Sequence, residues 1–113
     1  MDLSRKRQAY ERMVVGMIQK DRALLESAMT SDSLLYHMTG RAETREEYIR
    51  DILDGTLNYF DYEILSFTGD EATVRLLAKV YGGGKSWWTL KMRAEYAVED
   101  GETKIKTCKV RMG

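Results

Sequence analysis

The stretch Ser86–Glu99, SWWTLKMRAEYAVE, decides the fold of this chain. Its residues Trp88, Leu90 and Met92 fall at every second position, with polar residues between them. Successive side chains of a β-strand point to opposite faces of the sheet, so this period of two predicts a long strand with one buried face. Asp100-Gly101 follows at once and is typical of a β-hairpin turn. The stretch therefore predicts an antiparallel sheet.

The same period of two extends on both sides of this stretch. The predicted strands are Asp61–Thr68, Glu71–Tyr81, Ser86–Glu99 and Glu102–Met112. Short glycine-containing connections make consecutive strands antiparallel neighbours, so together they form a C-terminal four-stranded meander. In the last strand Ile105 is out of phase with Cys108, which predicts a β-bulge near Lys106-Thr107 that helps to bend the sheet.

The first half of the chain has helical spacing instead. In Leu3–Lys20 the apolar residues Tyr10, Met13 and Met17 share one stripe of a helix. Asp21 is a suitable N-cap for a second, short helix, which we expect to end at Ser31-Asp32. A strand is then predicted over Ser33–Met38.

A third helix has the clearest start signal. Thr44-Arg45-Glu46-Glu47 is a capping box, in which Thr44 and Glu47 satisfy each other's free backbone N–H groups. Asp54-Gly55 ends this helix, because glycine adopts the left-handed cap without steric cost. Three helices followed by a meander predict an α+β fold with the helices on one face of the sheet.

Length and composition narrow the possible functions. At 113 residues the chain is expected to form one domain, residues 1–113. Its 18 basic and 18 acidic residues balance, which argues against a nucleic-acid partner. No apolar run is long enough for a membrane span. A lone cysteine, Cys108, fits a cytoplasmic protein, and with a lone histidine it excludes the common metal sites, so no metal and no cofactor are expected.

The order of these elements and several local motifs resemble the nuclear transport factor 2-like superfamily, in its bacterial branch of ketosteroid isomerase-like and SnoaL-like (polyketide cyclase-like) proteins. The motifs are Lys20-Asp21, Leu35-Tyr36-His37-Met38-Thr39-Gly40, Thr44-Arg45-Glu46-Glu47-Tyr48-Ile49, Gly55-Thr56-Leu57-Asn58-Tyr59 and Trp88-Thr89-Leu90-Lys91-Met92. The resemblance implies a cone-shaped, cystatin-like roll with a strongly curved sheet and an interior pocket. It also implies a homodimer built through the outer face of the sheet. It does not imply a reaction, because the fold hosts many functions.

His37 is the foremost catalytic candidate. It stands where the resembling isomerases carry an aspartate general base, and a histidine suits proton transfer at neutral pH. The alternative is a pocket-lining histidine that is satisfied by a tyrosine or a backbone carbonyl. The isomerases also need a tyrosine on the first helix, but Met13 stands at that position. Tyr10, one turn earlier, is the substitute candidate, and the Trp88 strand lacks the second acid, so ketosteroid isomerase activity itself is not expected.

A set of large side chains is expected to line the pocket. These residues are Met13, Met17, Tyr48, Tyr59, Trp88 and Met92. Methionine adapts to varied apolar shapes, and tyrosine adds hydroxyl groups, so the set suits a small apolar or amphipathic molecule. The same residues also fit a plain hydrophobic core.

Trp87 must point to the opposite side of the sheet from Trp88. With Tyr81 and Arg93 it predicts an aromatic and charged outer surface of the kind that favours a homodimer. Two other features carry no function: Gly82-Gly83-Gly84-Lys85 lacks the helix of a phosphate-binding loop, and Cys108 is expected to pack in the core.

Three functions follow from the sequence. The first is a small-molecule-binding domain with a mostly apolar pocket. The second is a cofactor-free isomerase, cyclase or lyase that uses His37 as general base, assisted by Tyr10 or Tyr59. The third is a homodimeric association module without an active site.

Overall fold

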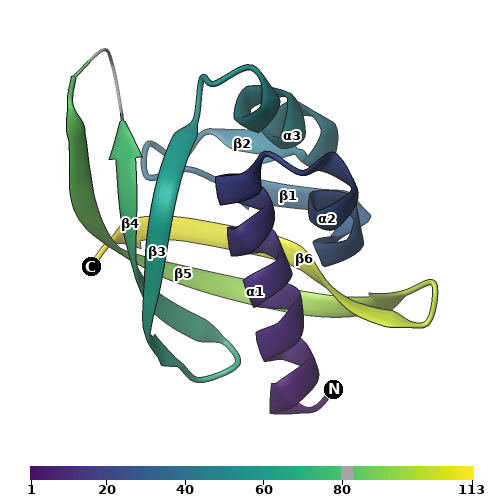
Figure 1. Cartoon of the computed structure of the whole chain (residues 1–113). Helices are drawn as coiled ribbons and strands as arrows, with labels where there is room; N and C mark the ends of the chain where they lie inside the picture. The colour runs from purple at the N-terminus through teal and green to yellow at the C-terminus, as the bar shows by residue number, and fades with distance from the viewer. Residues whose placement is uncertain (80–82) are drawn as a thin grey trace.

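The computed structural model describes residues 1–79 and 83–113. Figure 1 shows three helices on one side of a curved sheet. The helices are α1 (Leu3–Gln19), α2 (Arg22–Ala28) and α3 (Arg45–Leu53). The strands are β1 (Met29–Tyr36), β2 (Ala42–Thr44), β3 (Asn58–Phe67), β4 (Glu71–Lys79), β5 (Lys85–Glu99) and β6 (Glu102–Met112). They form one sheet in the order β2-β1-β6-β5-β4-β3, which confirms the α+β cone expected from the sequence.

The helix boundaries follow local chemistry. Asp2 caps α1 by accepting a 2.8 Å hydrogen bond from the Arg5 backbone N–H, and Asp21 caps α2 through the Leu24 N–H. Between them Lys20 adopts the left-handed conformation, with a φ of 54°. The capping box of α3 is present in both directions between Thr44 and Glu47.

The C-terminal four strands of the sheet agree with the sequence prediction. The four strands β3 to β6 form the expected antiparallel meander. The bulge in β6 lies where it was predicted, because Glu95 pairs with Thr107 and Tyr96 with Ile105, which leaves Lys106 as the extra residue. Such a bulge increases the local twist and bend.

The first strand differs from its prediction. β1 begins at Met29, directly after α2, although the second helix was expected to end at Ser31-Asp32 and the strand to begin at Ser33. Its partner is β6, and the pairing is parallel, with Met29 opposite Ile105. The sheet is therefore mixed. A parallel partner that lies far along the chain leaves no local signal, so periodicity alone missed this start.

β2 was not predicted at all. It is only three residues long and folds back on β1 through a turn at Thr39-Gly40, so that Leu35 pairs with Glu43. Gly40 has a φ of 87°, a backbone angle that residues with a side chain rarely adopt. This hairpin matters because it brings a charged residue from β2 against the end of β1.

The core lies between the helices and the concave face of the sheet. Alternate residues of β4 and β5 point into it, and Leu76 and Met92 are almost fully buried. Trp88 follows the same inward phase, whereas Trp87 is 43% exposed on the outer face. No helix in the described part of the chain is long and apolar enough to cross a membrane.

Candidate functional site

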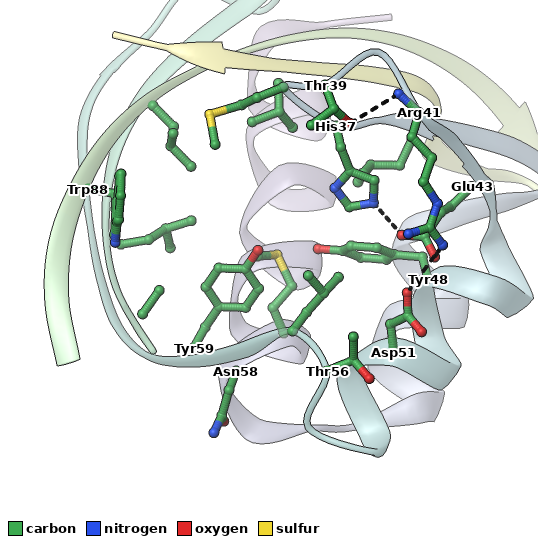
Figure 2. Close-up of a pocket in the computed structure, with 18 of the residues that line it drawn as sticks. His37, Thr39, Arg41, Glu43, Tyr48, Asp51, Thr56, Asn58, Tyr59 and Trp88 are labelled. Atoms are coloured by element: carbon green, nitrogen blue, oxygen red, sulfur yellow. Dashed lines mark hydrogen bonds and ion pairs between the residues drawn. The ribbon is translucent and has the colours of Figure 1, made fainter. Parts of the chain in front are cut away.

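A cavity of about 900 Å³ lies between the helices and the concave face of the sheet. It is lined by residues from α1, β1, α3 and the inner faces of β4, β5 and β6. Figure 2 shows that its side chains divide into two groups, an apolar wall and a polar end. A concave, largely apolar hollow with a few convergent polar groups is the usual form of a small-molecule site.

The apolar wall is built by the period-two residues of the sheet and by one residue of α1. Its members are Met17, Leu35, Leu76, Ala78, Trp88, Leu90, Met92 and Val110. The indole Nε1 of Trp88 is buried and has no hydrogen-bond partner within residues 1–79 and 83–113. Buried polar atoms normally have a partner, so this N–H is one of the few polar features of the wall.

The polar end is organised around His37, the chain's one histidine. The β1–β2 hairpin positions it: the His37 N–H donates to the Arg41 carbonyl at 2.9 Å, and Gly40 N–H donates to the His37 carbonyl at 2.8 Å. The imidazole Nε2 is hydrogen-bonded to Oε1 of Glu43, whose side chain is only 1% exposed. Figure 2 shows the second ring nitrogen turned toward the cavity.

Glu43 itself is held by two further charged residues. The Arg41 guanidinium lies 3.3 Å from Oε2 of Glu43 and 3.9 Å from Oδ2 of Asp51 on α3. Burial raises the pKa of Glu43, the neighbouring Asp51 carboxyl raises it further, and His37 opposes both. The four side chains thus form one connected cluster at the mouth of the cavity.

Two tyrosine hydroxyls face the same space. Tyr48 projects from α3 and is 2% exposed, and Tyr59 projects from the start of β3. In Figure 2 both hydroxyls point to the middle of the cavity, and neither is joined to another drawn residue. Burial raises the pKa of Tyr59 to about 12 and raises the pKa of Tyr48 well above its ordinary value, so both stay protonated at neutral pH and can donate hydrogen bonds.

Two of the predicted site residues do not reach the cavity. Tyr10 was expected to assist His37, but its hydroxyl donates to Sδ of Met92 at 3.3 Å and its ring packs on Phe67. Met13 was expected in the lining and is instead fully buried in the core. The reason is the course of α1, along which Met17, one turn closer to the C-terminal end, is the residue that borders the cavity.

The outer face holds the residues predicted for a dimer. Trp87 is stacked beneath the Arg75 guanidinium, which lies 4.7 Å from its ring centre. Arg93 is exposed and lies 3.8 Å from Glu71. Tyr81, the third predicted residue, lies outside the described residues.

The sequence reasoning missed Glu43, Arg41 and Asp51. The turn at Thr39-Gly40 was an available signal for Glu43. A tight turn there folds the chain back on itself and brings residue 43 near residue 37, which directly follows β1. In the described ranges no three histidine, cysteine, aspartate or glutamate side chains are grouped so that they could hold a metal ion.

Comparison with known proteins bears on the fold. No family model and no curated protein matches the sequence. Among solved structures, an NTF2-like protein from Cytophaga hutchinsonii superposes with a TM-score of 0.68 at 18% identity, over 93% of each chain. The hexachlorocyclohexane dehydrochlorinase LinA-type3 from Novosphingobium barchaimii gives 0.71 at 14% identity, over 97% of this chain and 85% of that one.

A third similar structure is an LEH-like epoxide hydrolase from M. tuberculosis, with a TM-score of 0.75 at 12% identity, over 98% of this chain and 84% of that one. At these identities the similarity concerns the fold and not the chemistry. The superpositions extend over 93–98% of the chain, and the chain therefore has the nuclear transport factor 2-like fold.

Proposed function

We propose that this protein binds a small apolar or amphipathic molecule in the cavity, with the polar part of the ligand at His37. The observation that carries the proposal is the arrangement of the cavity: an apolar wall faces one imidazole nitrogen and two tyrosine hydroxyls that are not joined to any other residue drawn in Figure 2. Tyr48 is 98% buried, and its hydroxyl points into the cavity. A side chain that served only the hydrophobic core would be expected to give this buried hydroxyl a hydrogen-bond partner.

Binding can be tested with N-phenylnaphthylamine, an uncharged fluorophore whose emission rises in apolar surroundings. We expect the protein to bind it and the variant Ala78→Phe to lose this binding, because residue 78 lines the cavity and the larger ring fills it. Leu77→Phe is the matched control, since residue 77 alternates with residue 78 and faces the outer side of the sheet. Equal binding by Ala78→Phe and the unchanged protein would contradict a ligand in the cavity.

A second function, proton removal from the bound molecule, is favoured by the contact between His37 and Glu43. With Nε2–H bonded to the Glu43 carboxylate, the lone pair of Nδ1 is free to take a proton from a carbon next to a carbonyl. The C–H electron pair then forms the C=C bond of an enolate, and the new charge on oxygen is stabilised by hydrogen bonds from Tyr48 and Tyr59. Glu43 stabilises the imidazolium, so the step needs no cofactor.

Two structures with the same fold support an enzymatic reading, since their names describe a dehydrochlorinase and an epoxide hydrolase, both of which act on small molecules. The proposal for this chain rests on its own residues, and the comparison adds only that the fold can house such chemistry.

Proton removal can be measured before the substrate is identified. A panel of apolar ketones is incubated with the protein in D₂O, and exchange of the hydrogens next to the carbonyl is followed by mass spectrometry. We expect faster exchange with the protein, a loss of about 10²-fold or more in His37→Gln, and a smaller loss in Glu43→Gln. An unchanged exchange rate in His37→Gln would rule out this role while leaving ligand binding untouched.

We also propose a homodimer formed through the outer face of the sheet. Trp87, Arg75 and Arg93 give that face the aromatic and arginine content that is enriched at protein interfaces. An association module without an active site would use this face alone. The polar cluster in the cavity would then have no role, which is why binding is the preferred function.

A further inference from the structure

The polar end of the cavity carries more negative than positive charge, and this bears on the ligand that it can accept. Glu43 and Asp51 supply two carboxylates, and Arg41 supplies one permanent cation. His37 adds a second positive charge only when it is protonated. With a neutral imidazole the four side chains therefore sum to one net negative charge.

Both basic groups already contact a carboxylate, His37 through Nε2 and Arg41 through Nη2. Nε2 of His37 is hydrogen-bonded to Oε1 of Glu43, and the Arg41 guanidinium is 3.3 Å from Oε2 of the same carboxylate. The guanidinium also lies 3.9 Å from Asp51, so it faces carboxylates of both β2 and α3. A carboxylate or sulfonate brought to this end would meet two like charges whose counter-charges are already engaged.

Lys79 also borders the cavity and has to be considered as a possible partner for an anion. It is exposed, and it shares the outward phase of β4 with Arg75 and Leu77. An ammonium group on the solvent side of the sheet is screened by water and contributes little to recognition inside the cavity. Among the polar groups that do face the interior, the hydroxyls of Tyr48 and Tyr59 are neutral hydrogen-bond donors.

We infer that the site selects uncharged molecules that carry a hydrogen-bond acceptor such as a carbonyl oxygen, and that it rejects acids, with Asp51 as the residue that enforces the rejection. This rests on the binding function proposed above and adds the chemical class of the ligand. Asp51 is assigned this part because, within residues 1–79 and 83–113, its one ion-pair contact is with Arg41 at 3.9 Å, whereas Glu43 contacts both His37 and Arg41.

A pair of probes with the same aromatic body tests the inference. N-phenylnaphthylamine is uncharged, and anilinonaphthalene sulfonate adds one negative charge to the same ring system. Binding of each is measured to the unchanged protein and to Ala78→Phe, and the signal that survives in Ala78→Phe is subtracted as surface binding. We expect the sulfonate to bind the cavity at least about tenfold more weakly than the uncharged probe.

Two variants change the charge of the polar end in opposite directions. Asp51→Asn removes one carboxylate and should reduce the difference between the probes to roughly threefold or less, mainly by strengthening sulfonate binding. Arg41→Gln removes the cation and should widen the difference. Because one variant is expected to gain binding and the other to lose it, a general loss of folding cannot imitate the pattern, and thermal unfolding of each variant is recorded alongside.

The outcomes separate this inference from the function on which it rests. Failure of the uncharged probe to bind the cavity would overturn the binding function itself. Uncharged-probe binding with equally tight sulfonate binding would leave binding in place and overturn the charge selection. A tenfold difference that is the same in Asp51→Asn would overturn the assignment to Asp51.

Discussion

His37 can serve as a ligand contact or a base only because Glu43 fixes its ring. Glu43 is buried at 1% exposure and lies between an imidazole, a guanidinium and a second carboxyl. Burying a carboxylate costs desolvation free energy unless its neighbours compensate the charge. A chain would therefore rarely retain such a group for stability alone. At the scale of single residues, the cluster is therefore the strongest sign of a function.

The raised pKa of Glu43 has a consequence for stability. A carboxyl group with a raised pKa binds its proton more tightly in the folded than in the unfolded state, so its contribution is complete below the ordinary value of 4.5 and is lost as the pH rises through the folded value. We expect the free energy of unfolding of the protein, relative to that of Glu43→Gln, to fall as the pH rises above 4.5. Chemical denaturation at a series of pH values measures this difference.

Glu47→Gln provides the matched control on a neighbouring element. The Thr44 backbone N–H donates to Glu47 and lowers its pKa, so the stabilisation from Glu47 is lost as the pH falls through the folded value, below 4.5. Above pH 4.5 this variant should differ from the protein by a constant amount. A flat difference for Glu43→Gln over the same range would show that Glu43 is not held in the environment described.

The sequence could identify part of this site. His37 was predicted because it stands where the resembling isomerases carry an aspartate, and Met17, Tyr48, Tyr59, Trp88 and Met92 were expected around it on grounds of pattern. Tyr10, predicted to assist His37, and Met13, predicted for the lining, both lie outside the cavity lining, because a helical stripe shows which side of α1 is buried but not where along the helix the cavity begins. Glu43 was missed because a strand of three residues has no detectable period, so the turn at Thr39-Gly40 was the signal from which it could have been inferred.

At the scale of elements, α3 is the part that supplies the site with both Tyr48 and Asp51. Its position depends on the capping box at Thr44, whose hydroxyl accepts from the Glu47 N–H while Glu47 accepts from the Thr44 N–H. This reciprocal pair was predictable because it is local, requiring only four consecutive residues. The start of β1 and the whole of β2 depend on distant pairing and left no comparable signal.

Thr44→Ala should destabilise the protein by about 1 kcal/mol, the usual effect of losing an N-cap side chain. Thr44→Ser keeps the hydroxyl and should lie close to the unchanged protein. Urea denaturation followed by circular dichroism compares the three. Equal losses in both variants would mean that the methyl group of Thr44, and not the cap, stabilises the start of α3.

At the scale of the whole molecule, the curved sheet separates the two functions that we propose. Its concave face borders the cavity, and its convex face carries Trp87. The cone and the meander could be predicted from the alternation in β4 and β5 and from the order of elements. The homodimer stays a prediction, because the structure of one chain does not show a contact between two copies.

Replacing Trp87 with glutamate should dissociate that dimer, since it places a charge at the centre of an apolar contact. Val98→Glu is a suitable control, because Val98 is also exposed, at 63%, near the other end of β5. Light scattering after size exclusion gives the mass of each variant. A dimer mass for Trp87→Glu, or a monomer mass for the unchanged protein, would contradict an interface at this face.

The proposed function requires that Glu43 holds Nε2–H of His37 and leaves Nδ1 unprotonated toward the cavity. Because the chain has a single histidine, long-range proton–nitrogen NMR correlation of its imidazole reports this tautomer without ambiguity. At pH 8 we expect one tautomer, protonated at Nε2, that Glu43→Gln shifts toward a mixture. A proton found on Nδ1, or a mixture that Glu43→Gln leaves unchanged, would contradict it.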